Sequence, residues 1–207
     1  IDVADPRNRV FTLLANKIGI PVIQLQAGNI NQENIEWSFC DDDLMLSHGP
    51  NVKPQLAKLG FNIEKVVETG SAKLEKVINT RHCEEISLHS RFMINENSTV
   101  LLFLTSYIDL FDTQDEMDSQ KTLYNEIYLA VINEVSKKKN ISLVIKPHPL
   151  EVSTQLAQHN KMASKHENIF VAKASDNTSE LIVASDALIS FGSTATLDAL
   201  VLGKPVI

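Results

Sequence analysis

The sequence Lys146-Pro147-His148-Pro149 places a lysine and a histidine beside two prolines, directly after an apolar stretch. Proline fixes its own φ and disfavours the α region in the preceding residue, so this segment stays extended and no helix begins before Leu150. A lysine there supplies a positive point charge for a phosphate, and an imidazole can donate to a diphosphate oxygen or move a proton near neutral pH. We therefore predict that Lys146 binds phosphate and that His148 is the catalytic residue.

A second candidate site is Gly192-Ser193-Thr194, which joins an apolar stretch to a helical segment. Unpaired N–H groups and the dipole at a helix N-terminus attract phosphate, whereas the structural alternative is that a hydroxyl of this turn only caps the helix. Asp198 lies four residues after Thr194, on the same helix face, where it could bind ribose hydroxyls or simply face solvent. The chain has neither the glycine fingerprint of dinucleotide-binding proteins nor a P-loop, which disfavours a nicotinamide enzyme and a P-loop kinase.

These candidates belong to a repeating pattern of Val-, Ile- and Leu-rich stretches, each followed by turn residues and a helical segment. Near-continuous apolar strands are typical of an α/β protein whose parallel sheets are covered by helices on both faces. The predicted strands are residues 21–25, 44–47, 65–68, 100–104, 142–145, 169–172 and 187–190. The predicted helices are residues 7–18, 54–59, 72–79, 119–138, 151–165, 179–184 and 194–202. The predicted core stripe of helix 119–138 is Leu123, Ile127, Ala130, Val131 and Val135.

The apolar pattern lapses over residues 81–97, which we interpret as a linker between two Rossmann-like domains. Residues 1–80 would be the C-terminal part of the first domain, and residues 98–207 a second, nucleotide-binding domain. The chain opens without Met and stops at an apolar, strand-like segment, so we expect both domains to be incomplete.

Ligands of parallel sheets bind outside the carboxyl ends of the strands, so the residues that follow each strand are further candidates. They are Thr105 and Ser106 in the second domain, and Gln26, Gly28, Asn29, Gly70 and Ser71 in the first. His48 also follows a strand, whereas His82, His89, His159 and His166 are predicted to lie on the surface. No histidine pair has zinc-ligand spacing, and residues 41–43 are predicted to form a solvated turn, so no metal site is predicted.

Composition excludes several classes of protein. The chain has 207 residues, of which 43% are hydrophobic and 22% charged, as in ordinary globular proteins rather than disordered or collagen-like ones. A net charge of −7 gives no electrostatic footprint for nucleic acid. No apolar run approaches the roughly 20 residues that a membrane-spanning helix needs. The two cysteines, Cys40 and Cys83, lack metal or redox spacing, so we expect reduced thiols and a cytoplasmic location.

Four motifs together resemble the GT-B superfamily. They are IPVIQLQAG at residues 20–28, VETGS at 67–71, IKPHP at 145–149, and SDALIS with GST and GKPVI within 185–207. The order and spread of these motifs look most like bacterial surface-polysaccharide glycosyltransferases and the related UDP-N-acetylglucosamine 2-epimerases.

The resemblance implies two Rossmann-like domains that face a cleft, with the nucleotide held mostly by the second. The residues at 146, 148 and 192–194 would bind the donor phosphates, Asp198 would bind the ribose, and Gln26, Gly28 and Asn29 would face the sugar or the acceptor. It further implies a nucleotide-sugar donor and a glycan acceptor as partners. No metal or other cofactor is required, because helix N-termini and basic residues can neutralise the leaving diphosphate.

Two departures leave the member of the superfamily open. Many capsule-type transferases have a histidine where this chain has Ala27, whereas the epimerases share the Ala-Gly of this chain. Residues 191–198, however, lack the Ser-Gly-Gly and the paired glutamates of the epimerases. We expect a glycosyltransferase of surface-polysaccharide synthesis. The alternatives are UDP-N-acetylglucosamine 2-epimerisation, CDP-glycerol glycerophosphotransfer and a non-catalytic nucleotide-sugar-binding module. Peripheral association with the inner face of the membrane and the oligomeric state stay open.

Overall fold

The computed structural model describes residues 6–26, 28, 30, 37, 41–80, 87–106, 114–191 and 193–207. The chain forms two compact units, Ile1–Lys73 and Leu74–Ile207. The first unit ends earlier than residue 80, where the sequence analysis placed the end of the first domain. Each unit carries one parallel sheet, which confirms the predicted α/β class.

The first unit contains a three-stranded sheet of order β1-β2-β3. Its elements are α1 (Pro6–Lys17), β1 (Ile23–Leu25), β2 (Leu44–Ser47), α2 (Val52–Lys58), the 3-10 helix η2 (Ile63–Lys65) and β3 (Val66–Glu68). In the central strand, Met45 pairs with Gln24 on one side and with Val66 on the other. The small core of this unit consists of Trp37, Met45, Leu56, Phe61 and Val66.

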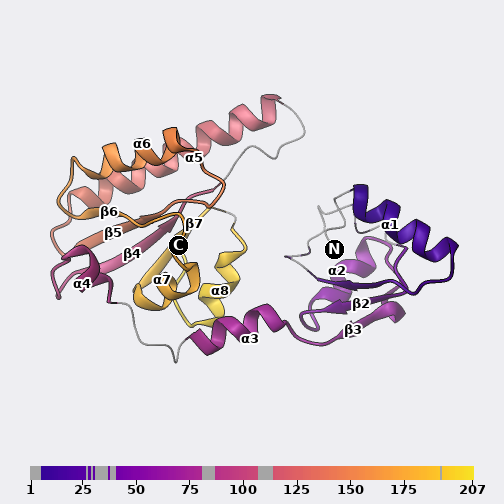
Figure 1. Ribbon diagram of the computed structural model, residues 1–207. Helices are drawn as coiled ribbons and strands as arrows, with labels where there is room; N and C mark the ends of the chain where they lie inside the picture. Colours follow the sequence, from indigo (N-terminus) through magenta and orange to yellow (C-terminus); the bar gives the residue numbers. More distant parts are fainter. Residues whose placement is uncertain are drawn as a thin grey trace. The chain divides into compact units, whose positions relative to one another are not determined.

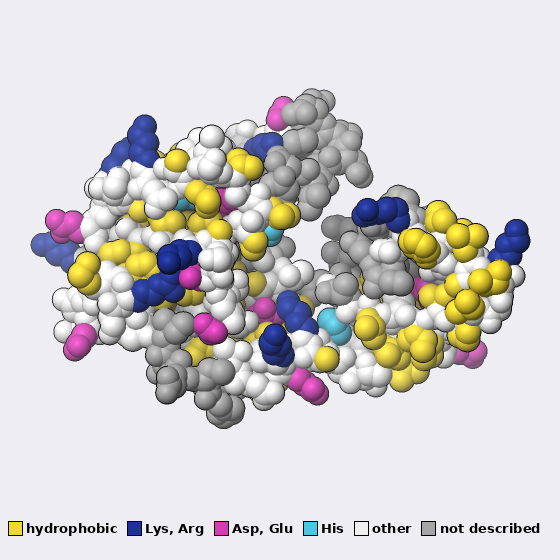
Figure 2. Space-filling view, viewed as in Figure 1, with side chains coloured by type: hydrophobic (Ala, Val, Ile, Leu, Met, Phe, Trp, Pro, Cys, Tyr) yellow, Lys and Arg dark blue, Asp and Glu magenta, His cyan; other side chains and the backbone are white. Residues whose placement is uncertain are grey.

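Large hydrophobic side chains of the first unit are also exposed. They are Val10, Phe11, Leu13 and Leu14 on α1, Ile18 and Ile20 after it, and Ile23 and Leu25 on β1. In the space-filling view, hydrophobic side chains gather on the visible face of this unit (Figure 2). The first unit therefore has apolar surface around α1 and β1 that its own described residues do not cover.

The second unit contains a four-stranded sheet of order β6-β5-β4-β7, with all strands parallel (Figure 1). The strands are β4 (Thr99–Leu104), β5 (Ile141–Lys146), β6 (Ile169–Val171) and β7 (Ala187–Ser190). The helices are α4 (Leu88–Phe92), α5 (Gln114–Ser136), α6 (Ser153–Ala163), α7 (Thr178–Ala184) and α8 (Ala195–Val201), and α3 (Ala72–Asn79) enters the unit. Every predicted strand of both units is present, with its ends within a residue or two of the prediction.

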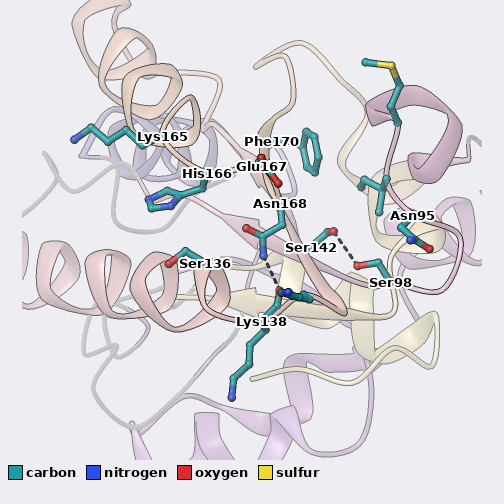
Figure 3. A pocket seen from close by; sticks show the side chains of 13 residues that line it. Asn95, Ser98, Ser136, Lys138, Ser142, Lys165, His166, Glu167, Asn168 and Phe170 are labelled. Carbon is teal, nitrogen blue, oxygen red and sulfur yellow. Dashed lines mark hydrogen bonds between the residues drawn. The ribbon is translucent and has the colours of Figure 1, made fainter.

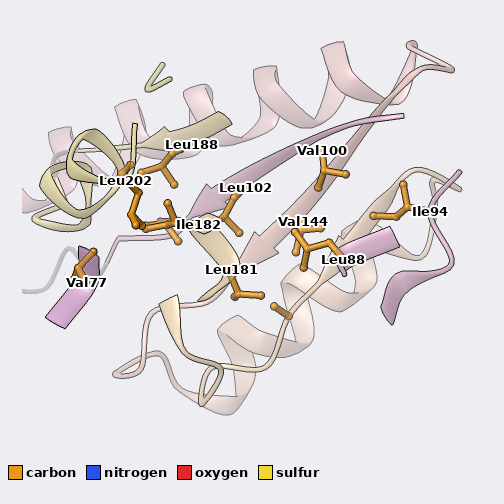
Figure 4. Close-up of a cluster of buried hydrophobic side chains, with 13 residues drawn as sticks. Val77, Leu88, Ile94, Val100, Leu102, Val144, Leu181, Ile182, Leu188 and Leu202 are labelled. Atoms are coloured by element: carbon orange, nitrogen blue, oxygen red, sulfur yellow. The ribbon is translucent and has the colours of Figure 1, made fainter. Parts of the chain in front are cut away.

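Helices cover both faces of this sheet, as the apolar strands predicted. Side chains alternate along β4: Phe103 packs with α5 and α6, whereas Leu102 and Leu104 pack with α7 and α8 on the other face. Figure 4 shows the cluster of this second face, with Leu102 beside Ile182 of α7. The period of two continues past the end of the strand. Thr105, the next residue, is therefore directed to the face covered by α5 and α6, where its hydroxyl contacts Glu151.

Helix α5 begins earlier than predicted, and its buried face differs from the predicted one. Val135 is buried as expected, but Leu123 and Ala130 are exposed, and Tyr124 and Tyr128 occupy the core instead. The two tyrosine rings stack with centroids 6.1 Å apart and contact Phe103. Aromatic burial rotates the apolar face by about one residue, because these rings bury more area than alanine or leucine would.

The segment predicted to be a linker contributes to the second unit. Within it, α4 begins after Ser87, whose hydroxyl accepts the N–H of Ser90 as an N-cap. Leu88 and Ile94 are buried in the same core cluster as Val77 of α3 (Figure 4). None of the helices that the structure describes combines the length and the apolarity needed to cross a membrane.

Candidate functional site

The sheet of the second unit brings the predicted site residues of that unit to one edge. Leu104 of β4 pairs with Lys146 of β5 on one side and with Ser190 of β7 on the other. Because the three strands are parallel and end in register, the segments that follow them emerge together. We call this the carboxyl edge: its described residues are 105–106, 146–149, 191, 193 and 194.

Thr105 and Ser106 join the neighbouring segments across the carboxyl edge. The backbone N–H of His148 donates to Oγ1 of Thr105 over 2.7 Å, which ties the segment after β4 to the segment after β5. The hydroxyl of Ser106 donates to the carbonyl of Phe191 over 2.8 Å, which ties it to the segment after β7. The two consecutive hydroxyls thus hold the histidine segment and the Ser193 turn at the same edge.

The imidazole of His148 is half-buried and has a defined orientation. Its Nδ1 accepts the backbone N–H of Leu150 over 3.2 Å. A ring nitrogen that accepts a hydrogen bond carries no proton, so the neutral ring of His148 carries its proton on Nε2. This tautomer makes Nε2 a hydrogen-bond donor at the carboxyl edge.

Lys146, which was predicted to bind phosphate, has its ammonium group engaged by the protein. Only 2% of the residue is exposed, and Nζ donates to the carbonyl of Pro147 over 2.9 Å and to that of Ala174 over 2.8 Å. Burial lowers the pKa of this lysine, while Asp176 and Glu151 oppose that effect. In this structure Lys146 joins the segments that follow β5 and β6 and brings a positive charge beneath the His148 segment.

In the turn that precedes α8, Ser193 makes a hydrogen bond of the capping kind, whereas the side chain of Thr194 makes none. Oγ of Ser193 accepts the N–H of Ala195 over 3.2 Å, which is the structural alternative foreseen for this residue. Thr194 is exposed at the start of the helix. Asp198 is 5% exposed, and its contact with a ribose stays a prediction. Gly192 lies outside the described residues.

A buried network behind His148 escaped the sequence analysis. Glu151 accepts hydrogen bonds from the Thr105 hydroxyl and, over 3.0 Å, from the His148 N–H, and it pairs over 2.7 Å with Nε2 of His159. Nδ1 of His159 lies 2.7 Å from the hydroxyl of Tyr128. The prediction that His159 lies on the surface is wrong, because this histidine is buried between α6 and α5. The spacing of these residues carries no local signal, since their contacts join distant parts of the chain.

Burial and hydrogen bonding have opposite effects on the carboxyl group of Glu151. Burial raises its pKa, but the hydrogen bonds from His159, Thr105 and the His148 N–H outweigh burial and hold the pKa below its usual value. Burial raises the pKa of the neighbouring Tyr128 hydroxyl. Glu151 is therefore a carboxylate near neutral pH and is the acceptor in its hydrogen bonds with Thr105, His148 and His159.

In the first unit, the predicted residues also follow strands. The side chain of Gln26 is buried and bridges two segments: its amide donates to the carbonyl of Gly28, and its carbonyl accepts the N–H of His48, both over 2.8 Å. Gly70 has a φ of +79°, a backbone conformation that favours glycine, and Ser71 precedes α3. Asn29 lies outside the described residues. The contacts of Gln26 show how the segments after β1 and β2 are held together, and its predicted role toward a sugar or acceptor stays a prediction.

A cavity of about 790 Å³ lies at the opposite edge of the second sheet, where β4, β5 and β6 begin. Several of its polar groups have partners in the protein: Ser98 and Ser142 share a hydrogen bond of 2.9 Å, and the amide nitrogen of Asn168 lies within hydrogen-bond distance of three backbone carbonyls. The side chains of Lys138 and Lys165 extend away from the centre of the cavity (Figure 3). The cavity is thus separate from the carboxyl edge.

Across the described parts of the chain, no three His, Cys, Asp or Glu side chains gather in a way that could hold a metal ion. Two of the aspartates at 41–43 have structural roles: Asp42 accepts from the Thr12 hydroxyl, and Asp43 accepts the N–H of Val22. Burial raises the pKa of Asp42. The expectation that the reaction needs no cofactor stays a prediction.

One protein family matches almost the whole sequence. The family described as CDP-Glycerol:Poly(glycerophosphate) glycerophosphotransferase matches residues 14–207. The chain belongs to this family. Glycerophosphotransfer from CDP-glycerol was among the alternatives drawn from the sequence, and the family match agrees with that alternative. A comparison with curated proteins gave no match.

Solved structures confirm the GT-B-like fold of this glycerophosphotransferase family member. S. aureus MnaA with UDP superposes with a TM-score of 0.68 at 16% identity and covers 94% of this chain and 52% of its own. UDP-GlcNAc 2-epimerase from Neisseria meningitidis, bound to UDP-GlcNAc, has a TM-score of 0.67 at 18% identity, and the match covers 95% of this chain and 54% of the epimerase. HepE from Anabaena, in complex with UDP-glucose, has a TM-score of 0.53 at 10% sequence identity, and the match covers 96% of this chain and 56% of HepE. The chain spans about half the length of these structures.

Proposed function

We propose that the protein transfers glycerophosphate from CDP-glycerol to a poly(glycerophosphate) acceptor, with the donor's diphosphate bound at the carboxyl edge of the second unit. Membership of the family supports the reaction. The observation that carries the site is the orientation of His148, whose Nδ1 accepts the Leu150 N–H and so leaves the proton on Nε2. A cytoplasmic location, where a nucleotide-activated donor is made, accompanies the proposal.

The chemistry is a displacement at phosphorus. A terminal hydroxyl of the acceptor forms a bond to the phosphorus that carries glycerol, and the bond from that phosphorus to the bridging oxygen of the diphosphate breaks. CMP leaves with the electron pair of that bond, and the proton of the attacking hydroxyl passes to the surrounding water. Negative charge grows on the oxygens of the leaving phosphate, so hydrogen-bond donors placed there lower the barrier.

The residues at the carboxyl edge supply such donors. Nε2–H of His148 would donate to a phosphate oxygen, and the hydroxyls of Ser193 and Thr194 would do so from the turn before α8. Lys146 would contribute its charge from beneath the segment, since its ammonium is held by two carbonyls. The proposal assigns no metal to this step, as the sequence analysis also expected.

The experiment is product analysis with the full-length protein. Incubation with CDP-glycerol and a short poly(glycerophosphate) primer should release CMP and lengthen the primer by glycerophosphate units. His148→Ala should slow this reaction by about a hundredfold or more, the usual effect of losing a donor to a developing oxyanion. Thr99→Ala, an exposed residue at the other end of β4, is the matched control and should leave the rate unchanged.

Other products would overturn the proposal. Free UDP and a mannosamine-type sugar from UDP-N-acetylglucosamine alone would identify an epimerase. Transfer of a sugar to the primer would identify a glycosyltransferase. Calorimetric binding of CDP without turnover of CDP-glycerol would identify a binding module, and nucleotide binding that survives both His148→Ala and Ser193→Ala unchanged would remove the site from the carboxyl edge.

A further inference from the structure

Glu151 joins the two segments of the carboxyl edge that carry His148 and Thr105. A single carboxylate oxygen, Oε1, accepts both the backbone N–H of His148 and the hydroxyl of Thr105. The same N–H also reaches the Thr105 hydroxyl, so the three groups form a closed set of hydrogen bonds. The position of the His148 backbone therefore depends on where this carboxylate is held.

The second oxygen of Glu151 anchors the carboxylate to the helices. Oε2 lies 2.7 Å from Nε2 of His159 on α6, and Nδ1 of the same ring lies 2.7 Å from the hydroxyl of Tyr128 on α5. The rings of His159 and Tyr128 also meet edge to face, with centroids 5.3 Å apart. Both nitrogens of His159 are thus engaged, which fixes the ring and, through it, the carboxylate.

Burial means that the Glu151 carboxylate needs all of its hydrogen-bond partners in place. Glu151 and His159 are 9% and 8% exposed, and a buried carboxylate is tolerated only when its hydrogen bonds are complete. The charged and titratable groups that face it are His159 and Tyr128, Tyr124 on α5, and Lys146 on β5. A neutral side chain could tie two loops together, as Gln26 does in the first unit. The carboxylate instead holds the backbone of the one imidazole at this edge.

We infer that Glu151 and His159 are positioning residues, which hold the His148 segment where its imidazole can donate to a ligand phosphate. This inference rests on the proposed function for the identity of the ligand. The restraint of the His148 backbone is independent of the proposed function, because its hydrogen bonds are formed within the protein, without a ligand.

The test combines nucleotide affinity with hydrogen exchange of the His148 amide, measured by NMR on the full-length protein. In Glu151→Ala the exchange of this amide should rise at least tenfold and the Kd for CDP should rise about tenfold. Glu151→Gln should stay within about threefold of wild type in both measurements, because its amide oxygen can accept the same two donors. His159→Ala, which removes only the support behind the carboxylate, should have an intermediate effect.

Two controls separate positioning from a general loss of stability. Ile132→Ala removes a buried side chain of α5 that makes none of the hydrogen bonds of the network. It should lower Tm but change neither the CDP affinity nor the His148 amide. His166→Ala removes the histidine beside the cavity at the opposite edge and should be silent as well. If Glu151→Ala does not fold, His159→Ala carries the same test.

Three results would overturn the inference. They are an unchanged His148 amide in Glu151→Ala and His159→Ala, an equal effect in Ile132→Ala at matched Tm, and a Glu151→Gln chain as impaired as Glu151→Ala. If wild type fails to bind CDP, the proposed function fails instead. The amide exchange then decides the positioning role by itself: a rise specific to Glu151 and His159 supports it, and no rise overturns it.

Discussion

At the two edges of the sheet in the second unit, different kinds of side chain donate hydrogen bonds to backbone carbonyls of neighbouring segments. Where β6 begins, the two N–H groups of the neutral Asn168 amide are shared among the carbonyls of Val135, Lys138 and Ile141. At the carboxyl edge, the ammonium of Lys146 donates to the carbonyls of Pro147 and Ala174. A neutral amide meets the structural need without the desolvation cost that a buried ammonium carries.

The difference extends to the neighbouring groups. At the opposite edge, where β4, β5 and β6 begin and which we call the amino edge, Ser98 and Ser142 share a neutral hydrogen bond. At the carboxyl edge, Glu151 and His159 form a buried, ionisable pair. Buried ionisable groups at the carboxyl edge are difficult to explain by stability alone, because neutral hydrogen bonds suffice in the corresponding places at the opposite edge. Buried ionisable groups with shifted pKa values are typical of functional sites.

The largest effect should come from the imidazole at the carboxyl edge. His148→Ala should lower kcat for glycerophosphate transfer by about a hundredfold, which corresponds to about 2.7 kcal/mol of transition-state stabilisation, with little change in Tm. Ser98→Ala at the amino edge should leave kcat unchanged. Steady-state rates of CMP release measure both variants, and equal losses of activity would remove the distinction between the edges.

Replacing the two carbonyl-binding side chains should separate stability from binding. Asn168→Ala leaves three carbonyls without this donor and should lower the free energy of unfolding by about 2 kcal/mol, with CDP affinity unchanged. Lys146→Met should cost less, about 1 kcal/mol, because the burial of a charge is relieved, but it should weaken CDP binding about tenfold. Urea unfolding and calorimetry give the two quantities. A loss of affinity in Asn168→Ala as large as that in Lys146→Met would contradict the comparison.

The ionisable pair should make the stability of the second unit depend on pH in a defined direction. The pKa of Glu151 is held below its usual value of 4.5, so its contribution is complete above that value and is lost as the pH falls through the folded-state pKa. Between about pH 5 and pH 3, wild type should therefore lose more stability than Glu151→Gln.

The matched control for this pH dependence is the exposed pair Glu134–Lys137, with an N–O distance of 2.6 Å. The hydrogen bond from Lys137 also lowers the pKa of Glu134, but water and salt screen an exposed pair. Glu134→Gln should leave the acid limb of the unfolding curve as in wild type at moderate salt. A larger change in Glu134→Gln than in Glu151→Gln would show that burial is not what matters.

The smallest effect should come from the turn before α8. Ser193→Ala removes the oxygen that accepts the Ala195 N–H and should cost about 0.5–1 kcal/mol of stability. If the hydroxyl also donates to a phosphate, the Kd for CDP should rise about threefold. Ser193→Asn keeps a capping oxygen and should restore stability. An unchanged CDP affinity in both variants would reduce Ser193 to a cap.

Most of the fold could be predicted from the sequence. The strands were located because their apolar runs are local and continuous, and the parallel arrangement followed from helical segments between them. The boundary of the first unit and helix α4 were harder. Leu88 and Ile94 form only a short apolar pattern, and their burial depends on a surface made by Val77 and other distant residues.

The candidate site divides in the same way. The sequence placed His148, Thr105 and Ser193 at the ends of their strands, and the parallel sheet brings those ends together. It could not show that Lys146 is buried, because the carbonyl of Ala174 lies 28 residues away along the chain. Similarly, nothing local marks His159 on a polar helix as a buried residue.

The order of strands, helices and turns can be read from the amino-acid sequence alone, since these elements depend on periodicity and turn chemistry over a few residues. Which ionisable side chains are buried and paired depends instead on the folded arrangement. Thr105 and Glu151 are 46 residues apart, and Tyr128 and His159 are 31 apart. Such partners meet only when the sheet has formed and the helices have packed on it, because hydrogen bonds are made by proximity in space rather than in sequence.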